Sequence, residues 1–236
     1  MTATEQYINS CNKKGYCFLP ELFSDIDLNS ISTLIEDHFI NKQTKEYSIR
    51  NLFQEIPNLK SLVLTPSIVS LVSKFFSTPA FVTKALYFNK NTAENWYVPF
   101  HQDISIHVNE KIDTEGYGMW TLKEGLVGVV PPVHILENTV TLRIHLDDTD
   151  ERNGALKVIE GSHLEGIRKS ESLKAAFDTA AVCCLKKGDA MLMKPLLFHA
   201  SSKNNSGKPR RVIHIEFNNL PLNGSLEWAE KTPVTN

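Results

Sequence analysis

The sequence predicts an α+β chain, mainly β, in which helices near the amino terminus pack on one sheet of a larger antiparallel β-structure. Helical periodicity is confined to the first part of the chain, and from residue 81 onward the pattern changes to alternating or β-branched runs. Strands do not alternate with helices, which argues against βαβ units and a parallel sheet. A jelly-roll sandwich is the fold that this order of elements fits best.

The chain is expected to form one domain. It has 236 residues, of which 42% are hydrophobic and 22% charged, as is typical of a globular protein that buries a sizeable core. No internal repeat, low-complexity tract or linker rich in proline, glycine or serine divides it. We therefore predict a single domain over residues 1–236.

Charge and hydropathy point to a small-molecule partner. The formal net charge is -2 and lysine and arginine form no run, so neither nucleic acid nor a membrane surface is an expected partner. The amino-terminal residues lack the apolar core of a signal peptide, and no apolar run approaches the length of a membrane span. The four cysteines form no C-x-x-C pair, which favours free thiols. We expect a cytoplasmic protein.

Three local patterns predict the first elements. The stretch GYCFLP, residues 15–20, is typical of a short strand. Ser24 is a suitable helix N-cap, because apolar residues follow it at helical spacing as far as Phe39. A second helix is expected to begin at Thr65 and Pro66, since threonine caps helices and proline favours the first helical position.

The later part of the chain is dominated by strand patterns. One long stretch, residues 109–139, has no clear periodicity. Loops of this length in a compact domain are often functional, and Tyr117 and Trp120 favour an ordered cover over an active site. The predicted strand segments are residues 80–90, 97–108, 138–148, 155–162, 189–201 and 210–217.

Three of these segments pair an apolar face with a polar one. Such a polar face either meets water, as in half-exposed antiparallel sheets, or lines a cavity between two sheets. Histidine recurs on these faces, whereas solvated faces usually carry lysine, glutamate and threonine. The polar faces consist of His101, Asp103, Ser105 and His107; of Thr141, Arg143, His145 and Asp147; and of Arg210, His214 and Glu216.

His101 and Asp103 in PFHQDISI could chelate a metal ion. They lie two positions apart on a predicted strand, so their side chains point the same way from Cα atoms about 6.6 Å apart. His199 ends a later strand, and Arg210 opens the strand that returns after the turn SSKNNSGKP. Two histidines and one carboxylate form the metal-binding triad of non-heme Fe(II) oxygenases, and a nearby arginine offers a planar fork for a carboxylate.

The sequence resembles the phytanoyl-CoA dioxygenase family of Fe(II)/2-oxoglutarate-dependent oxygenases. The resemblance covers nearly the whole chain and rests on KKGYCFLPELFS, PFHQD, DERNGALKVIEGSH, KKGDAMLMKPLLFHASS and PRRVIHIEF. It implies a double-stranded β-helix of jelly-roll, cupin-like type with N-terminal helices packed outside it.

The resemblance also implies a role for individual residues. His101, Asp103 and His199 are implied as the catalytic iron ligands, Arg210 as the partner of the distal carboxylate of 2-oxoglutarate, and Ser201 as its hydroxyl helper. The implied cofactor is Fe(II), with 2-oxoglutarate and O2 as co-substrates. Related halogenases have a small residue in place of Asp103, so the implied reaction is hydroxylation of a small molecule with release of succinate and CO2.

Arg143 departs from the family pattern, in which a tryptophan often stands near the co-substrate. It is either a second anion contact, for co-substrate or substrate, or a buried partner of Asp147. With Thr141 on the same face, it is counted among the candidate cofactor contacts. Further candidates for substrate contact are Lys84, His107 and Trp120.

The stretch RNGALKVIEGSH is interpreted as architecture. Asn153 and Gly154 together are a strong hairpin signal. His163 at its end is only a remote candidate for supporting the site.

Two other functions fit the same residues. A zinc-dependent hydrolase could use the same two histidines and aspartate to activate water, but it would not need Arg210 beside them. A non-catalytic jelly-roll protein could use the histidines to line a ligand pocket. Anaerobic addition of Fe(II) and 2-oxoglutarate separates these alternatives, because only the oxygenase should give a visible metal-to-ligand charge-transfer band.

Overall fold

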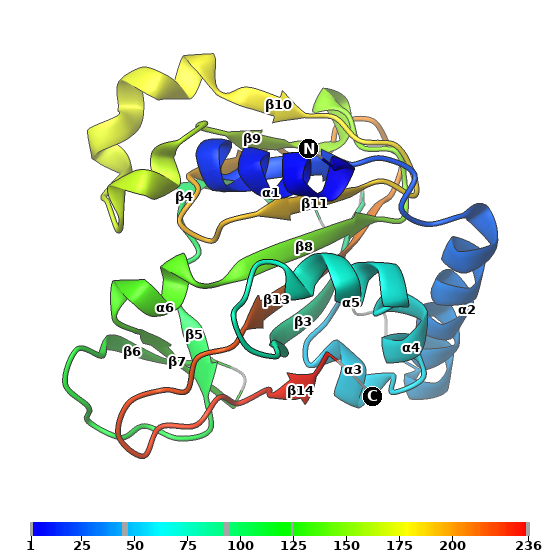
Figure 1. The fold of residues 1–236 in the computed structure, drawn as a ribbon. Helices are drawn as coiled ribbons and strands as arrows, with labels where there is room; N and C mark the ends of the chain where they lie inside the picture. Colours follow the sequence, from blue (N-terminus) through cyan, green and yellow to red (C-terminus); the bar gives the residue numbers. More distant parts are fainter. Residues whose placement is uncertain (1, 44–46, 92–94, 124, 235–236) are drawn as a thin grey trace.

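The computed structural model describes residues 2–43, 47–91, 95–123 and 125–234 (Figure 1). One residue of the predicted cover, at position 124, lies outside these ranges.

A large antiparallel sheet forms one wall of the molecule. Its strands are ordered β1-β11-β8-β13-β3-β14, and β2 pairs with β3 beside this path. The long strands β3 and β13 pair over their whole length, with Arg210 opposite Lys90 at one end. The strands are β1 (Tyr16–Leu19), β2 (Ser48–Ile49), β3 (Phe81–Lys90), β8 (Val140–His145), β11 (Ala190–Met193), β13 (Arg210–Asn218) and β14 (Thr232–Pro233).

A smaller antiparallel sheet forms the opposite wall, with its strands ordered β10-β9-β12-β4. A cavity between the two sheets is lined by residues of both, so their inner faces look toward each other. This is the predicted jelly-roll fold. The strands are β4 (Val98–His101), β9 (Leu156–Val158), β10 (Ala181–Cys183) and β12 (His199–Ser201).

The amino-terminal helices cover the outer face of the large sheet, as predicted. Figure 1 shows α2 to α5 gathered on one side of it. Their apolar residues form one core with Leu142, Ile144, Ile213, Ile215 and Phe217, the outward-facing residues of β8 and β13. The helices are α1 (Ala3–Lys14), α2 (Asp25–Lys42), α3 (Leu52–Glu55), α4 (Leu59–Val63), α5 (Pro66–Ser73) and α6 (Val133–Glu137).

Helix caps explain where these helices begin. Ser24 and Asp27 form a reciprocal capping box at the start of α2, and Thr65 accepts a hydrogen bond from the backbone of Ile68 at the start of α5. Both starts were predicted. Helix α1 was not, although Thr2 and Glu5 form the same capping box at its start. That motif was the available signal for this helix.

The space between the sheets is apolar at one end and polar at the other. Tyr16, Leu156, Met191, Met193 and Leu197 belong to the apolar cluster at the β1 and β11 end. Toward β8, β13 and β3 charged residues and histidines join apolar ones on the inner face, and the cavity lies there. Part of each polar face predicted from sequence thus lines an interior cavity, through His101, Asp103, Arg143, Arg210, His214 and Glu216.

Residues 109–139 are more regular than predicted. They contribute to a third antiparallel sheet of β5 (Ile106–Val108), β6 (Gly118–Lys123) and β7 (Leu126–Val130), and to α6. Ile106, Val108 and Val129 bury their side chains in a core that this sheet shares with Leu226 and Trp228. The sequence suggested a loop because β6 and β7 do not alternate clearly between apolar and polar residues, although the two strands pair with each other. None of the described residues that line the cavity comes from this segment, so its role as a cover stays a prediction.

The Asn153-Gly154 pair does not form the predicted hairpin. Asn153 ends a short 3-10 helix, and Gly154, at φ +86°, leads the chain from the large sheet into β9 of the small one. The backbone conformation that favours Asn-Gly in hairpins is used here for a crossover between sheets. The 3-10 segments are η1 (Glu151–Asn153), η2 (Ser162–Glu165) and η3 (Ser170–Thr179).

Two further expectations concern the whole chain. Cys11, Cys17, Cys183 and Cys184 are free thiols, as expected. Among the described helices, none combines the length and the apolar character that crossing a membrane requires.

Candidate functional site

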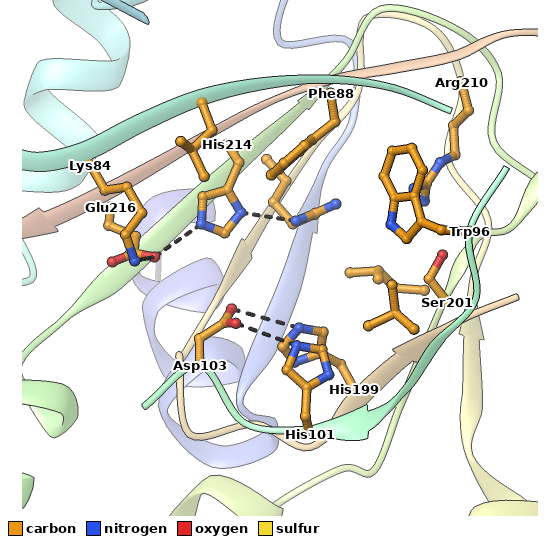
Figure 2. Close-up of a pocket in the computed structure, with 14 residues that line it drawn as sticks. Lys84, Phe88, Trp96, His101, Asp103, His199, Ser201, Arg210, His214 and Glu216 are labelled. Atoms are coloured by element: carbon orange, nitrogen blue, oxygen red, sulfur yellow. Dashed lines mark hydrogen bonds and ion pairs between the residues drawn. The ribbon is translucent and has the colours of Figure 1, made fainter. Parts of the chain in front are cut away.

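His101, Asp103 and His199 converge at one wall of the cavity (Figure 2). His101 ends β4 and His199 begins β12, and the two are directly paired in the small sheet. Asp103 Oδ1 lies 3.5 Å from His101 Nε2, and its Oδ2 lies 3.6 Å from His199 Nε2. One ligand atom from each residue lies within 4.8 Å of the other two, which is close enough to surround a single cation.

Hydrogen bonds set the tautomer of both imidazoles. His101 Nδ1 donates to the carbonyl of Pro99 and His199 Nδ1 to that of Leu197, each at 2.9 Å. The Nε2 atom of each ring therefore keeps its lone pair and points toward Asp103. Metal-binding histidines usually have this arrangement, so the donor set fits a divalent cation.

The backbone around the three residues is held by Gln102. Its amide nitrogen donates to the carbonyls of Gly166 and Leu196, at 2.8 and 2.7 Å, and its oxygen accepts from the backbone of Arg168 at 2.9 Å. The backbone nitrogen of Asp103 donates to Pro195 at 2.9 Å. The segment that carries Asp103 is thus tied to the segment that leads to His199.

Charge in the triad centres on the Asp103 carboxylate. Burial opposes its ionisation, but the neighbouring His199 and His101 hold the pKa of Asp103 well below its usual range. Burial dominates at His199 and lowers its pKa to about 4. At His101 burial is outweighed by the hydrogen bond and the charge of Asp103, and the pKa is raised. The two shifts differ in sign because His199 is more deeply buried than His101.

A second group of possible ligands shares Asp103. His214 Nε2, Glu216 and Asp103 also lie within 4.8 Å of one another. However, the Lys84 ammonium sits 2.8 Å from Glu216 Oε1, and His214 Nε2 donates to the same oxygen at 3.1 Å. These donors already occupy the position that a cation would take, so the first group fits a metal ion better.

The end of the cavity near Arg210 is rich in positive charge and hydrogen-bond donors. Arg210 Nη1 and Ser201 Oγ both donate to the carbonyl of Gly154, at 2.6 and 3.0 Å. Ser201 Oγ also accepts from Lys90 Nζ at 2.9 Å. Figure 2 shows Arg210, Ser201 and Trp96 across the cavity from Asp103. Two buried cations and a hydroxyl therefore lie together without a carboxylate among the described residues around them.

Lys90, which lies directly behind Ser201 and outside the residues that line the cavity, was missed by the sequence reasoning. Its side chain is fully buried, and burial followed by repulsion from Arg210 and Arg143 lowers its pKa to about 7. The sequence showed only that Lys90 ends a predicted strand; its place directly opposite Arg210 comes from the register of β3 and β13. Like charges that face each other across strands are unfavourable unless an anion is shared between them.

The remaining predicted contacts divide into two groups. Arg143 and Lys84 line the cavity, and Arg143 Nη1 donates to His214 Nδ1 at 2.9 Å. The alternative that Arg143 pairs with Asp147 is wrong, because that carboxylate binds the Arg211 guanidinium at 2.9 and 3.0 Å. The predicted residues that do not line the cavity are Thr141, His107, Trp120 and His163.

The sequence matches the family described as "Phytanoyl-CoA dioxygenase (PhyH)" over residues 12–212. The chain belongs to the phytanoyl-CoA dioxygenase family. Among curated proteins, it is 25% identical to L-proline trans-4-hydroxylase of Streptomyces griseoviridis over 248 aligned residues, covering 88% of this chain and 84% of that protein.

Solved structures of similar fold are more distant in sequence. HygX of Streptomyces hygroscopicus, crystallised with nickel and 2-oxoglutarate, superposes with a TM-score of 0.69 at 14% identity, over 92% of this chain and 87% of HygX. EctD of S. alaskensis, crystallised with 2-oxoglutarate and 5-hydroxyectoine, gives a TM-score of 0.69 at 16% identity, over 92% of this chain and 76% of EctD. At these identities the likeness concerns the fold.

Membership of the phytanoyl-CoA dioxygenase family defines the general chemistry. Its members use Fe(II), 2-oxoglutarate and O2, so this chain is an iron- and 2-oxoglutarate-dependent oxygenase. The observed donor set agrees with this, since it pairs two neutral imidazoles with a carboxylate.

Proposed function

We propose that this oxygenase hydroxylates a C–H bond of a small molecule, with His101, Asp103 and His199 binding Fe(II). The observation that supports this most directly is the convergence of their ligand atoms opposite the Arg210 anion site. When bound, Fe(II) with O2 and 2-oxoglutarate supplies the oxidising chemistry, with succinate and CO2 as by-products. The protein contributes the ligand geometry and the orientation of the co-substrate.

Arg210 and Ser201 are proposed to hold the distal carboxylate of 2-oxoglutarate, with Lys90 behind them. The guanidinium would give a charge-assisted hydrogen bond, and the Lys90 ammonium, which does not itself line the cavity, donates to Ser201 Oγ and adds positive charge behind that hydroxyl. A zinc-dependent hydrolase would have no use for this second cationic site, which favours the oxygenase among the functions that the triad allows.

Hydroxylation is favoured over other oxidative outcomes by two observations. Asp103 leaves no vacant ligand position for a halide in the protein-derived triad, and the curated relative is named as a hydroxylase of L-proline. The primary substrate is proposed to be a small molecule of metabolite size.

The charge-transfer band provides the test. We expect purified protein with Fe(II) and 2-oxoglutarate, under anaerobic conditions, to show a weak visible band that Asp103→Ala abolishes. Asp148→Ala, which removes an exposed carboxylate on the surface, is the matched control and should retain the band. A wild-type protein without the band, or an Asp103→Ala variant that keeps it, would contradict the proposed ligand set.

The reaction itself is tested by product analysis. Wild-type enzyme should form succinate from 2-oxoglutarate faster in the presence of its substrate, and the product should carry one added oxygen atom. Substrate-dependent succinate formation with a product that has gained no oxygen would refute hydroxylation while leaving oxygenase chemistry in place.

A further inference from the structure

Arg143 is a buried cation that forms no ion pair with a described residue; the carboxylate that acts on it electrostatically is Asp103, a member of the proposed metal triad. The side chain of Arg143 lies on the inner face of β8, and the residue is only 7% exposed. Nη1 donates to His214 Nδ1 at 2.9 Å, and Nε is buried without a hydrogen-bond partner among the described residues. Within the described part of the chain, no carboxylate forms an ion pair with this guanidinium. Arg211, by contrast, is fully paired with Asp147.

The imidazole of His214 does not neutralise this charge. Because Nδ1 accepts from Arg143, the ring proton lies on Nε2, which donates to Glu216 Oε1 at 3.1 Å. Glu216 in turn pairs with the Lys84 ammonium at 2.8 Å. The row Arg143, His214, Glu216 and Lys84 therefore contains one balanced ion pair, one neutral ring and one unbalanced positive charge at the Arg143 end.

The proposed co-substrate does not supply the missing anion. Its distal carboxylate would be balanced by Arg210 with Lys90 behind it, and its other carboxylate together with Asp103 would balance the two charges of Fe(II). The positive charge of Arg143 would remain, in a position where water is largely excluded. Buried charges in proteins are normally paired, so a further anion is expected when the site is filled.

We propose that Arg143 binds a carboxylate of the primary substrate, which makes the substrate a small carboxylic acid. This inference rests on the proposed function. The cavity measures about 180 Å³ and must also hold the co-substrate, which restricts the substrate part inside it to a small group. Leu86, Phe88 and Val98 line the same cavity and offer an apolar surface to a short hydrocarbon portion.

The first arm of the test concerns the co-substrate. Anaerobic titrations of the Fe(II) enzyme with 2-oxoglutarate and with pyruvate, which lacks the distal carboxylate, are compared in wild type and Arg143→Gln. We expect both affinities to change by less than about threefold, within the ordinary scatter of a substitution that removes no direct contact. A loss of about tenfold or more for both acids would assign Arg143 to the metal-bound carboxylate of the co-substrate and overturn the proposal.

The second arm concerns the substrate class. The Fe(II)–2-oxoglutarate complex is titrated with L-proline, other short α-amino acids and short 2-hydroxy acids, each beside its primary amide, while the charge-transfer band is followed. At least one acid should perturb the band, and its amide should not. Arg143→Gln should lower the affinity for that acid by about 10- to 100-fold, as expected for loss of a charge-assisted hydrogen bond. Arg143→Lys should restore part of this affinity.

Matched controls separate the possible failures. Arg168→Gln removes an exposed guanidinium and should leave both arms unchanged. Arg143→Gln should melt at the wild-type temperature or above without ligands, because it removes an unpaired buried charge. Amides that bind as well as acids, or a panel in which no acid binds, would overturn the inference while the band itself upholds the proposed function. A wild-type protein without the band would refute both.

Discussion

Lys90 illustrates how a single buried charge links the site to pH. Its ammonium donates to Ser201 Oγ at 2.9 Å and to the carbonyl of Ser202 at 3.0 Å, and its pKa of about 7 reflects burial and the nearby arginines. A bound dianion would favour the protonated amine. Binding of 2-oxoglutarate above pH 7 should therefore be accompanied by proton uptake.

The first prediction follows for Lys90→Met. In wild type, the affinity for 2-oxoglutarate should fall as pH rises above about 7, by at most about tenfold per pH unit. Lys90→Met should bind about 10- to 100-fold more weakly at pH 6.5 and lose most of this dependence. Anaerobic titrations between pH 6.5 and 8.5 measure both effects. Lys203→Met, an exposed lysine of the neighbouring turn, should behave as wild type, and an unchanged pH profile in Lys90→Met would contradict the assignment.

Glu230 is a buried carboxyl outside the proposed chemistry. It is 2% exposed, accepts a hydrogen bond from the backbone of Ala85 at 2.9 Å, and leaves Oε1 without a partner among the described residues. Burial, reinforced by repulsion from Glu216, raises its pKa to about 7. Between about pH 4.5 and 7 the folded protein therefore holds a proton that the unfolded chain releases, and the free energy of unfolding falls as pH rises through this window.

The second prediction is that Glu230→Gln removes this pH dependence. The amide oxygen can still accept from Ala85, and no ionisation cost remains. We expect the variant to be more stable than wild type at pH 8 by about 3 kcal/mol at most, and equal to it near pH 4.5. Urea unfolding at the two pH values measures the difference. A constant offset between variant and wild type would show that Glu230 does not titrate in this range.

At the scale of elements, two segments far apart in the chain must meet for the triad to form. Strand β4 carries His101, and the loop before β12 leads to His199. Gln102, between two proposed ligands, bonds to three backbone atoms of other segments and points away from the metal position. Its three hydrogen bonds indicate a positioning role for Gln102.

The third prediction concerns Gln102→Ala. Loss of its hydrogen bonds leaves two carbonyls and one amide without their partner, which should lower the free energy of unfolding by about 2–4 kcal/mol. Because the segments that carry the ligands loosen, metal affinity should fall by about tenfold although every ligand remains. Chemical unfolding and metal titration measure these effects, with exposed Gln54→Ala as control. Full metal affinity in a destabilised variant would limit Gln102 to a structural role.

At the scale of the molecule, the jelly roll buries apolar residues on the outer face of its large sheet and charges in part of its interior. The outer face of β8 and β13 packs on the amino-terminal helices, while Arg143, Arg210 and Glu216 on the inner face meet the cavity. Stability comes mainly from the apolar packing between the large sheet and the amino-terminal helices. The polar interior is expected to be most stable when bound ligands balance its charges.

The fourth prediction is that ligands stabilise the whole fold. Ni(II), which does not support turnover, with 2-oxoglutarate at about 100 times the dissociation constant should add about 2.7 kcal/mol and raise Tm by about 5–10 °C. A chelator should reverse the shift. Asp103→Ala should show little of it, and an equal shift in that variant would place the bound metal elsewhere.

The sequence by itself determined that helices precede strands, the polar and apolar faces of three strand segments, and the placement of His101 and Asp103 two positions apart. These are properties of neighbouring residues, because side-chain direction alternates along a strand and caps act within one helical turn. The family resemblance added the fold and the expected site residues.

Only the tertiary structure decided which polar residues meet across the cavity. It placed Lys90 opposite Arg210 and paired Asp147 with Arg211. It also showed that Arg143 donates a hydrogen bond to the neutral imidazole of His214. It also placed Asn153-Gly154 at a crossover between sheets and ordered much of residues 109–139 as a third sheet. The physical reason is that cross-strand register and sheet packing join residues distant along the chain, and burial then makes their charges depend on those partners.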